Sequence, residues 1–267
     1  MTHASDPSHP RYKSLLARGR LEEAAEAGML AASALIAHGR GEAFDYLLGE
    51  VTTKSAAKAT KEAAARLAAA KRGVISFNGN TMALASDDLL RCAALAGADV
   101  EINIFYRTPE RMLALMSFLE NAKNRILNPT PQGINDDNWR KMVDGVRLLG
   151  ALPDGRIPGL EGPRANCHSD GILAADVLVV PLEDGDRCEA LVAMGGDVIV
   201  IDLNPMSRSA KMATVTVVDE ISRFATNLFQ ELKNPGLVDK NWDNLDILQS
   251  ALDCINDNLK KTENVGF

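Results

Sequence analysis

Polar side chains follow four short apolar runs of the sequence, and their types suit a nucleotide ligand. These polar segments are residues 78–81, 183–187, 202–208 and 219–220. Carboxylates can hold ribose hydroxyls or Mg²⁺, asparagine and glycine let a ligand approach the backbone closely, and arginine pairs with phosphates. A single Asp, Asn or Gly in such a place is more often a turn or a helix cap than a ligand contact. Four such places together favour a nucleotide-binding edge.

Two residues within the segment 38–50 have chemistry of their own. Arg40 stands between Gly39 and Gly41, where glycine permits a tight turn and a guanidinium can grip a phosphate through two parallel hydrogen bonds. The alternative for Arg40 is a surface ion pair. His38 is either a catalytic residue or a hydrogen-bonded histidine of the core or of a loop. No P-loop motif occurs, and the Gly-Arg-Gly triplet does not continue as a dinucleotide fingerprint.

The composition narrows the class of protein. A net charge of −7 argues against a general nucleic-acid binder, and 4% aromatic residues leave few stacking platforms for single strands. The four cysteines and four histidines show neither CxxC nor HExxH spacing, so we expect no zinc site and no disulfide framework. The sequence shows no secretory leader and no apolar run of about 20 residues, the length of a membrane span. We therefore expect a cytoplasmic protein that binds neither nucleic acid nor membrane.

The hydrophobic pattern predicts an α/β framework for these residues. Continuous apolar runs such as 176–182 are typical of strands buried on both faces, and they alternate with helical patterns. This alternation predicts a parallel sheet with helices on both faces. The expected strands are 74–77, 100–106, 176–182, 198–203 and 214–218. The expected helices are 10–26, 55–71, 87–98, one opening at Thr108-Pro109-Glu110, 136–149, 189–195, 207–213, 220–233 and 245–260.

We expect a single domain over residues 1–267, built from three parts. These are a helical N-terminal region of about 8–71, a sheet core of about 74–225 and a helical tail of about 226–267. Residues 38–50 are interpreted as a stretch interrupted by glycines, and 153–171 as a loop. Parallel sheets bind ligands outside the carboxyl ends of their strands, so the polar segments should meet at that edge.

Several long segments resemble one known family. They are 8–20, 38–50 (HGRGEAFDYLLGE), 76–81 (SFNGNT), 103–111 (NIFYRTPER), 156–164 (RIPGLEGPR), 175–195 and 198–221. They are similar to the archaeal 4-phosphopantoate–β-alanine ligase family, also called phosphopantothenate synthetase. The resemblance implies a homodimeric Rossmann-like enzyme of coenzyme A biosynthesis. It also implies that the carboxylate of 4-phosphopantoate is joined to the amine of β-alanine, while ATP is split to AMP and pyrophosphate through an acyl-adenylate.

The resemblance further implies which residues bind ATP. The positions carried over are Arg18, Arg40, Asp202, Leu203, Asn204, Ser207, Arg208, Asp219 and Glu220. The family has asparagine where this chain has Glu220, which leaves a backbone contact to be expected at that position. The tail beyond about residue 235 shows no motif of the family.

The chemistry of adenylation adds candidates for the remaining roles, since charge on the phosphates must be neutralised. Candidate ligands of Mg²⁺ are Asp184, Asp186 and Asp202. Candidates for the phosphate of 4-phosphopantoate are Arg107 and Arg164. Candidate catalytic residues are His38, Asp184 and Arg187.

Two other functions remain open on the sequence alone. One is a non-catalytic, nucleotide-binding regulatory relative of the ligase, and the other is a phosphosugar-binding isomerase that needs no ATP. The intact motifs favour the ligase, and formation of AMP would separate all three.

Overall fold

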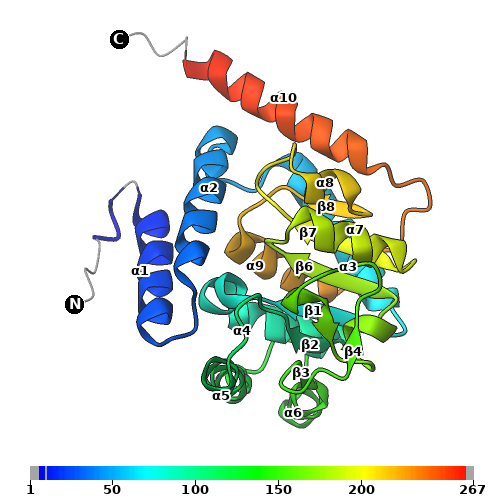
Figure 1. The fold of residues 1–267 in the computed structure, drawn as a ribbon. Coiled ribbons are helices and arrows are strands. Elements are labelled where there is room, and N and C mark those ends of the chain that lie inside the picture. Colours follow the sequence, from blue (N-terminus) through cyan, green and yellow to red (C-terminus); the bar gives the residue numbers. More distant parts are fainter. Residues whose placement is uncertain (1–5, 10, 263–267) are drawn as a thin grey trace.

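The computed structural model describes residues 6–9 and 11–262, and at the centre of this part lies a fully parallel six-stranded sheet (Figure 1). In spatial order its strands are β3 (Leu148–Leu149), β2 (Asp99–Ile102), β1 (Gly73–Phe77), β6 (Val177–Pro181), β7 (Asp197–Ile201) and β8 (Val215–Val217). This order runs outward in both directions from the β1–β6 pair, which makes the carboxyl ends of these two strands the switch point of a doubly wound sheet. The predicted Rossmann-like α/β fold is confirmed.

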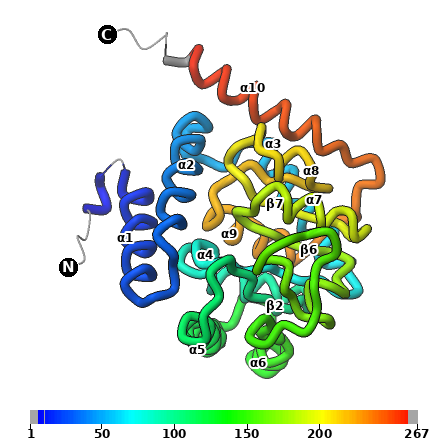
Figure 2. Tube along the Cα trace, in the orientation of Figure 1, coloured from blue at the N-terminus to red at the C-terminus, as the bar shows by residue number. Residues whose placement is uncertain are grey.

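Helices surround the sheet. They are α1 (Tyr12–Glu26), α2 (Ala32–Leu48), α3 (Lys54–Ala69), α4 (Gly79–Ala96), α5 (Pro109–Ile126), α6 (Asp136–Gly145), α7 (Gly185–Ala193), α8 (Arg208–Met212), α9 (Ile221–Leu232) and α10 (Asn244–Thr262). Helices α3, α4 and α9 pack together on one face of the sheet. On the other face, α7 contacts both the strand β7 and the helix α8. Figure 2 shows α1 and α2 as a neighbouring pair at one side of the sheet, with α10 crossing the molecule beyond them.

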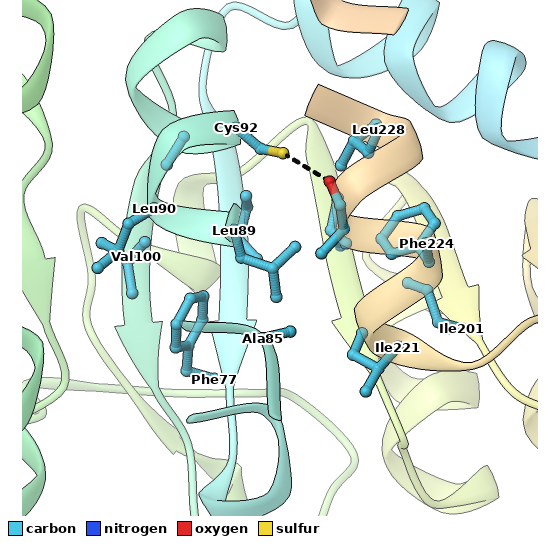
Figure 3. Packing of buried hydrophobic residues seen from close by; sticks show 14 of the residues in the cluster. Phe77, Ala85, Leu89, Leu90, Cys92, Val100, Ile201, Ile221, Phe224 and Leu228 are labelled. Atoms are coloured by element: carbon cyan, nitrogen blue, oxygen red, sulfur yellow. Dashed lines mark hydrogen bonds between the residues drawn. The ribbon is translucent and has the colours of Figure 1, made fainter. Parts of the chain in front are cut away.

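Alternate residues of each central strand enter the two layers of core. In β6, Val177 and Val179 join the cluster beneath α3, α4 and α9, whereas Leu178 and Val180 join the cluster beneath α7. This two-residue period is that of a strand covered on both faces. Figure 3 shows the first cluster, where Phe224 of α9 lies among apolar side chains of α4 and the sheet.

Helix starts follow the local capping chemistry. The Thr108 hydroxyl accepts a hydrogen bond from the Arg111 amide, and Pro109 occupies the first turn, as the sequence predicts for this start. The same kind of side-chain cap begins α3, α4, α6, α7, α8 and α9. Four of these caps, Asn78, Asp184, Ser207 and Glu220, belong to the polar segments that follow the strands. These residues therefore stabilise helix starts as well as lying at the carboxyl edge of the sheet.

The structure corrects several sequence predictions. Residues 38–48 are not interrupted by glycine, because Gly39 and Gly41 both lie inside α2, and Arg40 therefore stands on a helix and not in a tight turn. The predicted helix 136–149 ends at Gly145, and residues 148–149 form the edge strand β3. The predicted helices 87–98 and 189–195 begin earlier, at Gly79 and Gly185.

The expected loop 153–171 contains two short strands, and a buried carboxylate anchors its end. Strand β4 (Gly155–Arg156) pairs antiparallel with β5 (Asn166–Cys167), with short 3₁₀ turns η1 (Pro163–Ala165) and η2 (Ile172–Ala174). Fully buried Glu101 of β2 accepts hydrogen bonds from the His168 and Ile172 amides, both at 2.7 Å. This holds the segment against the sheet edge.

The predicted helical ends of the chain are confirmed where the structure describes them. Helix α1 begins at Tyr12, and α10 continues to Thr262; the predicted position 10 and the last part of the predicted tail, 263–267, lie outside the described residues. Met29 and Leu30, between α1 and α2, are buried against the chain itself. Within the described chain no helix is both long and apolar enough to cross a membrane.

Candidate active site at the carboxyl edge of the sheet

Asn78 ties together the two strand ends at the switch point. Its amide nitrogen donates to the Pro181 carbonyl at 2.9 Å and to the Leu182 carbonyl at 3.3 Å, while its oxygen caps α4 through the Thr81 amide at 3.0 Å. Leu182 has φ of +53°, a left-handed conformation that is uncommon for a residue other than glycine. The hydrogen bonds of Asn78 therefore fix the backbone at the carboxyl ends of β1 and β6.

Two cavities open at this edge, one on either side of Ala37 and Leu182, which line both. The smaller has a volume of about 310 Å³ and lies between α2, the start of α4 and the segment after β2. The larger has a volume of about 760 Å³ and lies between α1, α2 and the start of α9. The predicted meeting of polar strand ends at one edge is therefore realised as two compartments.

The smaller cavity combines an apolar wall with two arginines. Ala34 and Ala37 of α2 face the first turn of α4, where Gly79 and Asn80 line the cavity. Gly79 is required here, because a Cβ atom would lie 2.5 Å from Leu30 Cδ2. Helix α4 has non-helical backbone at Ala85, so its first part, residues 79–84, is short, and its Thr81 amide is already bonded to Asn78 Oδ1. The attraction of this cavity for an anion therefore comes from its arginines.

Arg164, a predicted phosphate ligand, lines the smaller cavity. Its guanidinium donates to Asn103 Oδ1 at 3.3 Å, to Asp184 at 2.9 Å and to Glu183 at 2.9 Å. Three of its five N–H groups are used in this way, so the side chain is held in place with donors remaining.

Arg111 is a second arginine of this cavity, and the sequence analysis did not single it out. Its Nε and Nη2 donate to the Met29 carbonyl at 3.1 and 2.9 Å, and its Nη1 donates to the Tyr106 carbonyl at 2.8 Å. Neutral carbonyl partners leave the positive charge uncompensated. Its place within the segment 103–111 was the one available signal.

Arg107, the other predicted phosphate ligand, instead donates to the Gly150 and Ile102 carbonyls.

The larger cavity receives two of the predicted ATP positions directly, Leu203 and Glu220. A third, Arg18 of α1, reaches the cavity wall through Glu42 of α2: its Nε and Nη2 donate to Glu42 Oε2 at 3.1 and 2.7 Å. Burial alone would raise the pKa of Glu42, but hydrogen bonds from Arg18 and Tyr46 outweigh it and hold the pKa below the usual range. Glu42 is therefore ionised and orients Arg18.

Asp202 and Ser207 form a polar turn after β7. The Ser207 hydroxyl donates to Asp202 Oδ2, the Asn204 amide donates to Asp202 Oδ1 at 2.9 Å, and Ser207 also caps α8. Burial raises the pKa of Asp202, while these hydrogen bonds and the positive charge of Arg40 oppose the shift. Arg40, predicted to approach this region, thus acts on Asp202 electrostatically from α2.

Asp219 and Glu220, which follow β8 at the carboxyl edge, also stabilise the fold. Asp219 is buried and accepts hydrogen bonds from Thr52 at 2.6 Å and from Arg223 Nε at 2.8 Å, which places its carboxylate in a network that links α9 to the chain after α2. Glu220 caps α9 by accepting from the Ser222 and Arg223 amides. Both carboxylates are committed to protein donors.

The candidate magnesium ligands are not brought together. Asp184 pairs with Arg164, Asp186 pairs with Arg208, and Asp202 is held by Ser207. Within the part of the chain that the structure describes, no three His, Cys, Asp or Glu side chains are grouped to hold a metal ion. The residues present do not fit a magnesium site built by the protein alone.

The candidate catalytic residues differ in where they lie. Arg187 is fully buried and paired with Glu183, away from both cavities, and Asp184 caps α7. His38 lines the larger cavity, and its Nε2 is buried without a hydrogen-bond partner in the described chain. Burial lowers the pKa of His38, although the carboxylates of Glu42 and Glu220 oppose this, so the imidazole is neutral at pH 7.

Together the strand order and the two polar cavities at the switch point define a doubly wound α/β protein with its ligand sites at the carboxyl edge. Comparison with known families narrows this class. The chain belongs to the phosphopantothenate/pantothenate synthetase family, whose model matches residues 55–258. The predicted family is confirmed, and the match extends through most of the tail, where the sequence analysis found no motif.

Individual relatives are similar over most of their length. A protein of Thermococcus onnurineus is 44% identical over 97% of this chain and 95% of its own. A protein of Thermococcus kodakarensis is 47% identical over 81% of this chain and 75% of its own. A protein of Methanosarcina mazei is 40% identical over 94% of each chain. Each of these relatives is named 4-phosphopantoate–β-alanine ligase.

Proposed function

We propose that this protein is a 4-phosphopantoate–β-alanine ligase. It would join the carboxylate of 4-phosphopantoate to the amine of β-alanine, forming 4′-phosphopantothenate for coenzyme A biosynthesis, with ATP converted to AMP and pyrophosphate. The observation that carries the proposal is the similarity, at 40–47% identity, to relatives that bear this name. The regulatory-relative and isomerase alternatives have no comparable support.

The smaller cavity has the chemistry of 4-phosphopantoate. Arg111 and Arg164 can take its phosphate, and Ala34 and Ala37 offer a wall for its two methyl groups. The dimethyl carbon of 4-phosphopantoate would face the alanines, and its phosphate would face the arginines. The carboxylate of the acid then extends toward the wall that the two cavities share.

The larger cavity and the neighbouring turn have the chemistry of ATP. Arg18, Arg40 and Arg208 are the cations for its phosphates, and Asp202 is the acid for its ribose hydroxyls. The remaining proposed contacts are Leu203, Asn204, Ser207, Asp219 and Glu220. Mg²⁺ would enter with the phosphates of ATP, since the protein's own carboxylates are engaged elsewhere.

The proposed reaction has two steps. The carboxylate attacks the α-phosphorus and pyrophosphate leaves; the β-alanine amine then attacks the acyl carbon, loses a proton and displaces AMP. Arginines beside the phosphates stabilise the charge that develops in the first step. The second step depends on holding amine and acyl group together. His38 remains the catalytic candidate beside the larger cavity, whereas Asp184 positions Arg164 and Arg187 supports the fold.

The test is to incubate the purified protein with ATP, Mg²⁺, 4-phosphopantoate and β-alanine, and to identify the products. AMP, pyrophosphate and 4′-phosphopantothenate in equal amounts are expected. ADP and phosphate would overturn the adenylate route in favour of an acyl phosphate. Binding of ATP without turnover would indicate the regulatory relative, and conversion of a phosphosugar without ATP would indicate the isomerase.

We also propose that residues 1–267 form a single domain and that two chains form a cytoplasmic homodimer. Met29 and Leu30, which precede α2, are buried within the chain and are not part of an exposed apolar surface. Leu35, Ile36 and Leu47 of α2 remain 41%, 68% and 50% exposed, which supports α2 as the contact surface.

A further inference from the structure

One residue that lines the smaller cavity carries a buried acceptor atom with no donor among the described residues. Asn80 is 6% exposed and lies in the first turn of α4, among the residues that line this cavity. Its Oδ1 is buried and makes no hydrogen bond with the described residues. Buried polar groups are nearly always hydrogen-bonded in folded proteins, so an unpaired acceptor in a ligand cavity indicates a donor that arrives with the ligand.

The direction of the Asn80 amide follows from its other contact. Its Nδ2 donates to the Ala34 carbonyl at 3.0 Å. A carbonyl oxygen can only accept, so turning the amide over would set two acceptors against each other. The unpaired atom is therefore the oxygen, and the group it lacks is an N–H or an O–H.

We propose that Asn80 Oδ1 accepts a hydrogen bond from the 2-hydroxyl group of the acid substrate and so selects a 2-hydroxy acid. This inference rests on the proposed function, which puts 4-phosphopantoate in the smaller cavity. In that molecule the carboxylate is an acceptor, the ionised phosphate is chiefly an acceptor, and the two methyl groups are neither. The 2-hydroxyl is the donor that the acid brings.

The other lining residues agree with this placement. Arg111 and Arg164 can only donate hydrogen bonds, so they suit the phosphate, whereas the O–H of the hydroxyl needs an acceptor such as Asn80 Oδ1. Ala34, whose carbonyl fixes the Asn80 amide, belongs to the apolar wall assigned to the methyl groups. The hydroxyl-bearing carbon is directly bonded to the dimethyl carbon, so a contact with one brings the other close to Asn80.

The experiment combines a variant with a substrate analogue. The rate of AMP formation is measured for the wild-type protein and for Asn80→Ala, each with 4-phosphopantoate and with the analogue in which hydrogen replaces the 2-hydroxyl. We expect the wild type to prefer the hydroxy acid, and Asn80→Ala to lose about 10- to 100-fold in kcat/KM for that acid. With the deoxy acid the two proteins should agree within about threefold, because the contact is absent from both.

Two further variants make the result decisive. Asn124→Ala removes an exposed asparagine of α5 and should change neither substrate's kcat/KM. Asn80→Gln retains the amide, with an N–H group for the Ala34 carbonyl and an acceptor oxygen, and should retain a preference for the hydroxy acid, which keeps the test available if Asn80→Ala does not fold. An equal loss on both acids in Asn80→Ala, or loss of the preference in Asn80→Gln, would overturn the inference. A wild type that forms no AMP with 4-phosphopantoate would overturn the proposed function itself.

Discussion

Arg40 differs from the other arginines proposed for the nucleotide, because no described residue holds its side chain. Arg18 is bonded to Glu42, and Arg208 is paired with Asp186 and Glu189, whereas Arg40 is exposed and takes part in no ion pair within 4 Å among the described residues. The surface ion pair considered as its alternative role is thus not formed in the described chain. Its guanidinium is available to a ligand.

Replacement of this arginine should therefore affect activity and leave stability unchanged. We expect Arg40→Ala to lower kcat/KM for ATP about 10- to 150-fold, the equivalent of about 1.5–3 kcal/mol of charge-assisted hydrogen bonding. Arg40→Lys should recover only part of the rate, because lysine lacks the planar fork. Arg140→Ala, an exposed arginine of α6, is the matched control. Wild-type kinetics in Arg40→Ala would remove Arg40 from the site.

Arg187 should behave in the opposite way. It is fully buried, paired with Glu183, and donates to Ser76 Oγ at 3.3 Å, so its removal leaves a buried carboxylate with Arg164 as its one charged partner among the described residues. We expect Arg187→Ala to lower the free energy of unfolding by about 3–5 kcal/mol, the usual result of breaking a buried ion pair. Urea denaturation measures this. Arg208→Ala, at an exposed ion pair, should change the free energy of unfolding far less; equal losses in both variants would contradict the assignment.

His38 should make stability depend on pH. Burial lowers its pKa in the folded protein below the ordinary value of 6.5, with Arg18 adding to the shift and Glu42 and Glu220 opposing it. As pH falls through 6.5, the unfolded chain takes up a proton that the folded protein does not, so the folded state loses stability. His38→Gln should lose less stability than the wild type between pH 7.5 and pH 5 in urea denaturation. Identical pH profiles would contradict a neutral, partly buried imidazole.

Among the elements, the short edge strand β3 depends on a glycine directly after it. Gly150 has φ of +98°, and a Cβ atom there would lie 2.4 Å from the Ile102 carbonyl oxygen at the end of β2. We expect Gly150→Ala to lower the free energy of unfolding by about 2–4 kcal/mol, because backbone strain and a backbone clash act together. Gly145→Ala, in α6 with open space around it, should be neutral or slightly stabilising. Thermal melts of the two variants that coincide would contradict this.

The elements also show what the sequence could predict. Strands such as β6 and β7 were predicted almost to the residue, because their apolar runs report burial on both faces. The helical course of residues 38–48 was not predicted. Each glycine disfavours a helix by about 1 kcal/mol, and this is outweighed by packing of α2 through Leu48 and by its buried carboxylates Glu42 and Asp45. The partners of these residues, such as Arg223 for Asp45, lie far from α2 in the sequence.

The site shows the same division between local and distant information. Polar residues at strand ends indicated the edge, and Arg164, predicted as a phosphate ligand, lines the smaller cavity. Arg111 was missed because its partners, the Met29 and Tyr106 carbonyls, are set by tertiary structure. Asp219 was expected to face ATP, but its pairing with Arg223 depends on how α9 leaves the sheet. The local sequence does not show which side chains already pair with other residues of the folded chain.

At the scale of the whole molecule, the proposed dimer should be visible in light scattering as a mass of twice one chain. Ile36 is 68% exposed on α2, and Ile36→Glu should shift the protein toward the monomer by placing a charge in an apolar contact. Leu152→Glu, at a position 85% exposed outside α2, should leave the mass unchanged. A monomeric wild type at micromolar concentration would contradict the dimer.

The shared wall between the two cavities has a thermodynamic consequence. Ala37 and Leu182 each border both compartments, and Leu182 is held in an unusual backbone conformation by Asn78. A ligand that shifts this wall from one side would alter the affinity on the other. Linkage then requires that the factor by which nucleotide tightens the acid equals the factor by which the acid tightens nucleotide. Cooperative loading of this kind would keep ATP from being spent when no acid is present to receive the adenylate.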